Sequence, residues 1–160
     1  MNIWQQLARK IERKKMYKIS KKLEELADKV IRERDDVSHL KEYGVQIIFL
    51  ECNKEVKENK VTYADTERIK DKYRAIIEAD FIITFYTSIT DKLSEKQKEI
   101  LMWHELKHVG FDGYKRWIIP HDAVDFIEII KEYGVDWADI KENKNEESKE
   151  TNQSTEGNDQ

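Results

Sequence analysis

The sequence contains one cysteine, Cys52, one proline, Pro120, and no long hydrophobic run. A single cysteine excludes an internal disulfide bond and is consistent with a reducing compartment, so we expect a cytoplasmic protein. Because no run approaches the roughly 18 apolar residues of a transmembrane helix, we expect no membrane span. The N-terminus also lacks the apolar segment of a secretory signal peptide, since charged residues begin at Arg9 and recur.

Charge is abundant but unevenly distributed along the chain. Charged and hydrophobic residues each make up 39% of the sequence, which is typical of a protein with a heavily charged surface. Residues 1–22 contain eight Lys or Arg against one acidic residue, a net charge of +7, although the whole chain has −4. Residues 141–160 contain three Lys against six acidic residues and almost no apolar side chains, so we expect a disordered polar tail there.

The spacing of apolar residues predicts helices at both ends of the ordered chain and strands between them. Residues 2–43 are expected to be helical, and further helices are expected from 65 or 66 to 78, over 94–109, and from 121 or 122 to Gly134. Strands are expected at 45–50, 61–63 and 81–87, with a short apolar stretch at 117–119. Strands mixed with helices without regular alternation indicate an α+β fold with a small mixed sheet.

We therefore divide the chain into three parts. Residues 1–43 form a basic helical N-terminal extension, residues 44–140 form the main domain, and residues 141–160 form the tail. The basic stretch of the first part has two interpretations, an anion-binding patch for nucleic acid or a negative surface, or simply the solvated face of a helix. The second interpretation is the more general one for charged helices.

The helix predicted at 94–109 has recognisable end signals. Ser94 is a good N-cap, and Gln97 three residues later completes a capping box. Gly110 is the predicted C-terminal stop. The sequence Lys-Glu-Tyr-Gly, which ends at Gly44 and again at Gly134, is interpreted in the same way, as a last helical turn closed by glycine.

Within that helix lies the pattern His104-Glu105-Leu106-Lys107-His108. Residues four apart lie on one face of a helix, so both imidazoles can reach one metal ion, with Glu105 beside them. In this H-E-x-x-H pattern the two histidines bind Zn²⁺ and the glutamate takes a proton from water. The alternative is a pair of core or solvated histidines without a metal.

A catalytic zinc usually has three protein ligands and one open position. His121, which follows His108 after 12 intervening residues, is our choice for the third ligand, because imidazole is the commonest metal ligand. Asp112, Asp122 and Asp125 are the alternatives, because carboxylates also bind zinc. If both are helical, Asp125 could instead orient His121, and Asp122 could cap the last helix.

The extended metzincin motif does not fit this chain. That motif requires a glycine at position 111 and a ligand at position 114, where the sequence has Phe111 and Tyr114. Tyr114 is retained as a candidate hydrogen-bond donor to an oxyanion, beside the alternative that it is only packed.

Three blocks of the sequence together resemble the phage metallopeptidases, small zincin-like domains of phage and mobile-element genomes. The blocks are 79–83 (Ala-Asp-Phe-Ile-Ile), the H-E-L-x-H helix, and His121-Asp122-x-x-Asp125-Phe126, and the resemblance covers roughly residues 45–135. It implies a zincin-like fold in which His104 and His108 bind the metal and Glu105 is the catalytic acid and base. It also supports His121 as a ligand by position.

The function expected from these features is hydrolysis of peptide bonds by a zinc-activated water, with a protein or peptide as substrate. In such proteases the substrate pairs with a sheet edge, for which strand 81–87 is the candidate. Two alternatives stay open, a zinc protein that contacts nucleic acid through the basic helix, and a non-enzymatic interaction protein with a metal-stabilised core. A repressor, a host defence protein and a self-cleavage site are all compatible substrates.

Overall fold

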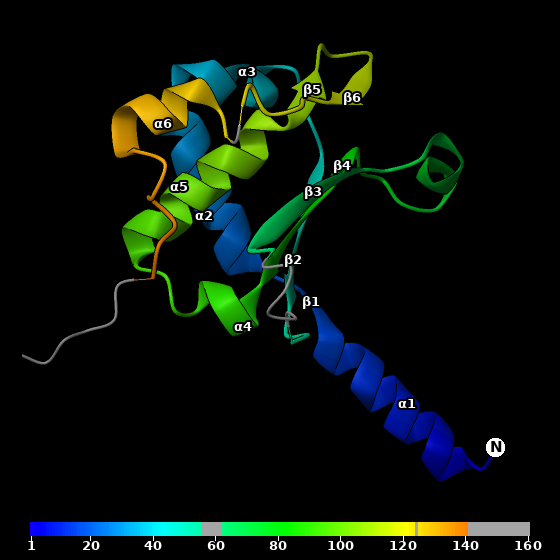
Figure 1. The fold of residues 1–160 in the computed structure, drawn as a ribbon. Coiled ribbons are helices and arrows are strands. Elements are labelled where there is room, and N and C mark those ends of the chain that lie inside the picture. Colours follow the sequence, from blue (N-terminus) through cyan, green and yellow to red (C-terminus); the bar gives the residue numbers. More distant parts are fainter. Residues whose placement is uncertain (56–61, 124, 141–160) are drawn as a thin grey trace, which may run out of the picture.

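The computed structural model describes residues 1–55, 62–123 and 125–140 (Figure 1). Their elements follow in the order α1 Ile3–Met16, β1 Tyr17–Ile19, α2 Lys21–Glu33, α3 Asp35–Glu42, β2 Ile47–Cys52, β3 Ala64–Arg68, η1 Asp71–Ala75 (a 3-10 helix), β4 Phe81–Tyr86, α4 Thr87–Thr90, α5 Glu95–Lys107, β5 Val109–Phe111, β6 Arg116–Ile118 and α6 Ile127–Tyr133. This mixture of helices and strands confirms the predicted α+β class.

The main sheet has four strands in the order β1-β2-β4-β3. β2 and β4 run parallel, with Ile47 opposite Phe81, and the two outer strands pair antiparallel, so the sheet is mixed as expected. β5 and β6 form a separate antiparallel hairpin after α5. Strands 45–50 and 81–87 are thus confirmed, the first displaced by two residues toward the C-terminus.

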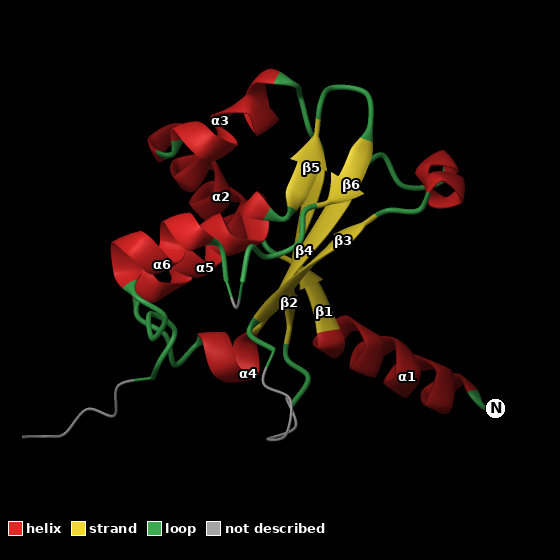
Figure 2. Ribbon diagram, turned by 45° about the horizontal axis from the view of Figure 1, so that its top comes forward, coloured by secondary structure: helices red, strands yellow, loops and turns green. Residues whose placement is uncertain are grey.

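The hydrophobic core lies between one face of the sheet and the helices packed on it (Figure 2). Because side chains alternate along a strand, Phe81, Ile83 and Phe85 of β4 all face this core and are almost fully buried. α2 and α3 contribute to the same core with Leu23, Ala27, Val30, Val37 and Leu40. We therefore propose that this part of the 1–43 extension folds together with the main domain.

β4 is an interior strand of the sheet. The prediction that strand 81–87 forms the sheet edge at which substrate binds is therefore wrong. β4 pairs with β2 on one side and with β3 on the other. The edge strand on that side is β3, and among the described strands none pairs with its outer side. The continuous apolar composition of β4 fits this position, because an interior strand of a covered sheet is buried on the helix side and partly buried on the other.

The helix predicted from 65 or 66 to 78 is wrong. The chain forms β3 over Ala64–Arg68 and then the short 3-10 helix η1. Ile69 is buried as expected, but Tyr73 and Ile76, also expected to face inward, are exposed. Apolar residues at helical spacing were outweighed here by backbone pairing with β4. Of the strand predicted at 61–63, residue 61 lies outside the described residues, and 62–63 precede β3.

Residues 2–43 contain three helices rather than one uninterrupted helical stretch. The short strand β1 separates α1 from α2, and Arg34 separates α2 from α3. β1 went unnoticed in the sequence because three residues give no periodic signal. Within the described residues, no helix combines the length and the apolar character needed to cross a membrane.

Two of the three predicted glycine caps are confirmed. Gly44 and Gly134 have φ of +70° and +80° and close the ends of α3 and α6. The prediction that Gly110 ends the helix is wrong. α5 ends at Lys107 with His108 as its C-cap, and Gly110 lies inside β5. A Cβ there would come within 2.4 Å of the Trp117 indole, so the close approach of β6 explains this glycine.

The last helix begins later than predicted. α6 starts at Ile127, whereas the sequence indicated a start at 121 or 122. The described residues between β6 and α6, 119–123 and 125–126, belong to no helix or strand, and His121 and Asp125 are among them. The Asp122 carboxylate accepts a hydrogen bond of 3.1 Å from the Ile127 amide, which satisfies an otherwise free N–H group at the start of α6.

Candidate metal centre

α5 carries the H-E-x-x-H pattern and starts where the sequence indicated. The Ser94 hydroxyl accepts from the Gln97 amide at 3.1 Å, and the Gln97 side chain accepts from the Ser94 amide at 2.9 Å. His104 lies in the last turn and His108 is the C-cap residue, still with helical backbone angles. Both imidazoles therefore project from the same face of one rigid element.

Three imidazoles meet at one point. The Nε2 atoms of His104 and His108 are 3.3 Å apart, and the Nε2 atom of His121 lies 3.0 Å from the first and 2.9 Å from the second. Among the described residues these three form the group able to hold a metal ion. The chain thus brings together the two histidines of α5 and the one histidine predicted from the irregular segment.

The Nδ1 atoms of His104 and His108 are already engaged, which fixes the tautomers of these two rings. Nδ1 of His104 lies 2.7 Å from a carboxylate oxygen of Asp125, and Nδ1 of His108 lies 2.6 Å from the Ile119 carbonyl oxygen. Both partners are acceptors, so each Nδ1 carries the proton and each Nε2 presents a lone pair. Lone pairs converging without a proton between them repel one another unless a cation lies among them.

The donor set fits a zinc ion. A zinc–nitrogen bond of about 2.0–2.1 Å and tetrahedral angles place two imidazole nitrogens about 3.3 Å apart. The observed Nε2 separations of 2.9–3.3 Å are close to that value. Burial also lowers the pKa of His104 to about 4 and lowers that of His108. Both rings are therefore neutral at pH 7, the form that binds metals.

His108 also holds the segment that brings in the third histidine. Its backbone carbonyl accepts from the Ile119 amide at 2.8 Å, while its Nδ1–H donates to the Ile119 carbonyl. Ile119 is two residues before His121, and Pro120 between them restricts the backbone. The position of His121 is thus set by two hydrogen bonds from another member of the triad.

Asp125 orients His104 and not His121, which corrects the prediction from their spacing. The spacing argument required a helix that contains both His121 and Asp125, and neither residue lies in a helix. The buried Asp125 carboxylate accepts from His104 Nδ1–H, from the Phe126 amide at 2.6 Å and from the Trp137 indole N–H at 2.8 Å. The sequence contained no signal for Trp137. Gln97 of the capping box places it, by donating to the Trp137 carbonyl at 3.0 Å.

We expect Asp125→Ala to weaken metal binding about 10- to 100-fold, the usual effect of removing a carboxylate that orients a ligating histidine. The reason is that the His104 ring loses the acceptor that fixes its tautomer and direction. Isothermal titration of the metal-free protein with zinc measures the effect. Asp122→Ala is the matched control, because its carboxylate accepts from the Ile127 backbone, and it should bind zinc as the wild type does. Equal losses in both variants would contradict the assignment of Asp125.

Glu105 lies against the triad from the same helix. One carboxylate oxygen is 4.0 Å from His104 Nε2, and the other accepts a 2.6 Å hydrogen bond from the Thr66 hydroxyl. The side chain is almost fully buried. Burial raises the pKa of Glu105 to about 7, and the hydrogen bond from Thr66 opposes this rise.

Thr66 belongs to β3 and was missed from the sequence, because that region was predicted to be helical. In the register with β4, Thr66 lies opposite Ile83, on the sheet face covered by α5. Its hydroxyl therefore reaches Glu105, although 39 residues separate them along the chain. Only the strand register places it, and the sequence does not display that register.

The remaining predicted site residues lie in the β5–β6 hairpin, away from the three imidazoles. The Asp112 carboxylate accepts from the backbone amides of Tyr114 and Lys115 in the turn, and these bonds lower its pKa. Asp112 is thus a turn residue, and it is absent from the metal-binding group. Tyr114 is 89% exposed at the hairpin tip, where its backbone amide supports the turn.

Comparison with known families bears directly on this centre. The sequence model of a family described as "Putative phage metallopeptidase" matches residues 15–145. The chain belongs to this family. The match covers the three histidines and Glu105, and it includes α2 and α3, which the resemblance seen in the sequence left out. Membership indicates a metallopeptidase-type domain and implies a metal ion, and among the described residues the three histidines are the group that could hold one.

Two curated proteins are similar to part of the chain. Both are components of the nuclease SbcCD, from two strains of Staphylococcus epidermidis, and each is 27% identical over 104 residues. That region is 61% of this chain but 10% of theirs, so the chain spans about a tenth of the length of the curated relatives it matches. No solved structure matches the chain.

Proposed function

We propose that the protein is a zinc-dependent peptidase of the H-E-x-x-H type with a zincin-like domain. The observation that carries the proposal is the convergence of three imidazole Nε2 atoms beside the buried carboxylate of Glu105. Three histidines with an open fourth position are the ligand set of a catalytic rather than a structural zinc. Family membership supports the same activity.

His104, His108 and His121 would hold the ion. A zinc ion bound there supplies Lewis-acid chemistry, which activates water and polarises a peptide carbonyl. Imidazole ligands also suit copper, iron and nickel, so zinc is proposed on the number and spacing of the nitrogens together with the family. The hydrogen bonds at the two Nδ1 atoms keep the rings directed at one point while substrate enters and leaves.

Glu105 would be the general base and then the general acid. In the metal-free chain burial raises its pKa to about 7, which makes it a stronger base than an exposed carboxylate, and it would accept a proton from a water molecule at the triad and return it to the leaving amine. The Thr66 hydroxyl fixes one carboxylate oxygen, which leaves the oxygen nearer His104 for this transfer.

The substrate would lie along β3. The strand touches Glu105 through Thr66, and its outer side pairs with no strand among those described. An extended peptide can add to such an edge through backbone hydrogen bonds. This moves the proposed binding edge from β4, where the sequence suggested it, to the neighbouring strand.

The test is peptide hydrolysis by the full chain, stripped of metal and then reloaded. A complex peptide mixture analysed by mass spectrometry should show new cleavage products after zinc is restored and none with chelator present. Zinc bound at one equivalent without any cleavage would contradict the peptidase and favour a metal-stabilised interaction protein. No zinc bound at all would contradict the metal centre itself.

Phage or mobile-element origin is part of the same proposal and rests on the family description. A repressor, a host defence protein and the chain itself are the proposed substrates, and the last is checked by the intact mass of the zinc-loaded protein. Weak nucleic-acid contact through the basic residues of α1 stays a prediction from charge. Binding of duplex DNA that falls steeply with added salt would support it.

A further inference from the structure

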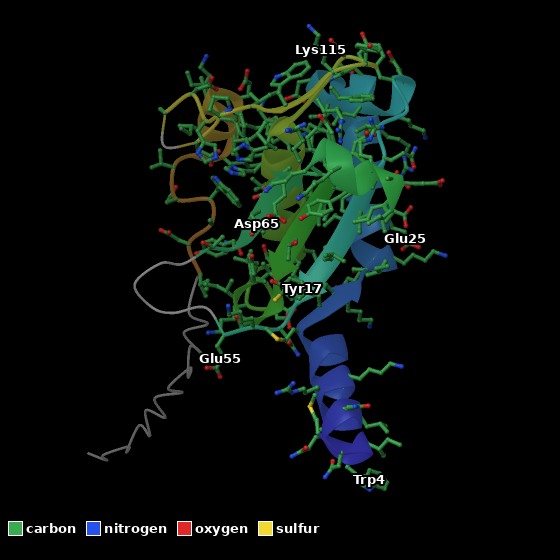
Figure 3. The ribbon with its side chains drawn as sticks, turned by 90° about the vertical axis from the view of Figure 1, so that its right-hand side faces the viewer. Trp4, Tyr17, Glu25, Glu55, Asp65 and Lys115 are labelled. Atoms are coloured by element: carbon green, nitrogen blue, oxygen red, sulfur yellow. The ribbon has the colours of Figure 1, made fainter. Side chains whose placement is uncertain are left out.

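α1 extends away from the rest of the protein (Figure 1). Figure 3 shows Trp4 at its far end and Tyr17 where the chain enters the sheet. The attachment is made by pairing of β1 with β2 and by a 3.1 Å hydrogen bond from the Asn53 amide to the Met16 carbonyl. From Ile3 to Ile11 every residue of the helix is exposed, so nothing in the described chain covers this part of α1.

The exposed surface of α1 includes an apolar stripe. Ile3, Leu7 and Ile11 are spaced four residues apart, and Trp4 adjoins them, so all four lie on one side of the helix. Their exposed fractions are 67%, 48%, 50% and 76% in the order Ile3, Leu7, Ile11, Trp4. A helix of 14 residues is only marginally stable in water without a partner for its apolar side.

The same helix is basic, while the rest of the chain is acidic. Arg9 and Lys10 are exposed on α1, and residues 1–22 carry a net +7. The other 138 residues therefore carry 21 basic and 32 acidic residues, a net −11, since the whole chain has 29 and 33. A body of net negative charge is repelled by a negative surface, so α1 and its flank, with their net positive charge, are suited to meet one.

We propose that α1 docks the protein on an anionic lipid surface. The apolar stripe would enter the boundary between headgroups and acyl chains, and Lys10, which adjoins the stripe on the helix, would face the lipid phosphates. A tryptophan at such a boundary is favoured because its ring is apolar and its N–H is polar. Nucleic acid would neutralise the positive charge of α1 but leave its apolar stripe in water. Pairing with α1 of a second copy of the chain would cover the stripe but bring two basic helices together. Anionic lipid satisfies both features.

Docking through α1 leaves the metal centre free. The three histidines, Glu105 and Asp125 come from α5 and from the segment after β6, and α1 contributes nothing to them. Lipid binding and metal binding should therefore respond to different substitutions, which allows the two to be tested separately.

The experiment is sedimentation of the full chain with vesicles of phosphatidylcholine alone or mixed with phosphatidylglycerol. Wild-type protein should bind the mixed vesicles, and added salt should weaken that binding. Leu7→Glu should bind at least about tenfold more weakly, because a charge replaces a leucine that would enter the lipid. Lys10→Gln should cost about fivefold on the mixed vesicles, and Arg9→Gln should cost less, because Arg9 lies on the side of the helix opposite the stripe. Trp4 emission should shift to shorter wavelength on binding, and Trp4→Phe should lose that shift.

The matched control is Ile76→Glu, an identical change in charge at an aliphatic side chain that is 81% exposed on the body. It should sediment like the wild type, and both glutamate variants should keep wild-type zinc content. No vesicle binding by the wild type would overturn the proposal, as would equal loss in the two glutamate variants. Binding of DNA in place of vesicles, or a dimer that Leu7→Glu converts to a monomer, would also overturn it.

Discussion

Glu105→Gln is expected to retain zinc and to lose hydrolysis by about 10²- to 10⁴-fold, the range that a general base contributes. The amide has the same size and can still accept the Thr66 hydroxyl, so the triad and its surroundings keep their shape. What the amide cannot do is accept a proton from water. Zinc content and the rate of cleavage of one peptide, measured on the same preparation, report the two properties independently.

The metal-free variant should also be at least as stable as the metal-free wild type at pH 8. The folded-state pKa of Glu105 is raised from 4.5 to about 7, so stability is lost as the pH rises through that interval and the buried carboxyl ionises. Glutamine never ionises and avoids this loss. Glu95→Gln, the same change in the exposed first turn of α5, is the control and should keep full activity. Cleavage at the wild-type rate by Glu105→Gln would refute the proposed role.

His108→Ala is expected to weaken zinc binding more than His121→Ala does. Structural zinc sites with four ligands bind with about 10–16 kcal/mol, or about 3 kcal/mol per ligand, so loss of one histidine should cost at least about a hundredfold. His108→Ala removes a ligand and also the side-chain bond to the Ile119 carbonyl, which helps to position His121. We expect a further factor of about ten from this second loss.

Competition with a chromogenic zinc chelator measures both affinities on one scale. His39→Ala is the control, because His39 lies in α3, its ring packs against Tyr43, and it is not a member of the group of three histidines that could hold the metal. It should bind zinc as tightly as the wild type. If His121→Ala proved as damaging as His108→Ala, the side-chain bond to Ile119 would contribute nothing to holding the third histidine.

The parts of the centre that could be predicted from the sequence are those determined by neighbouring residues. The spacing of His104 and His108 follows from helix geometry, and the Ser94–Gln97 cap marks where that helix starts. The strands at 45–50 and 81–87 were predictable because β-branched and aromatic residues are concentrated there.

What could not be predicted depends on contacts between distant segments. Thr66 reaches Glu105 only because β3 pairs with β4 in one register, and Trp137 reaches Asp125 because Gln97 holds its backbone. The error at 65–78 has the same origin, since spacing of apolar residues indicates a helix whether or not a neighbouring strand is available. The error at Gly110 arose because glycine ends helices and also permits close approach of strands, and sequence does not distinguish the two.

The β5–β6 hairpin makes the position of His121 independent of the length of the hairpin turn. Val109 pairs with Ile118, so the ladder brings the chain back beside His108 whatever the length of the turn beyond Phe111 and Arg116. Residues inserted at the tip near Gly113 would extend the hairpin into solvent and leave the triad intact. A single residue inserted between Ile118 and His121 would instead redirect the third imidazole. We therefore expect the chain to tolerate a change in length at the hairpin tip and not between β6 and His121.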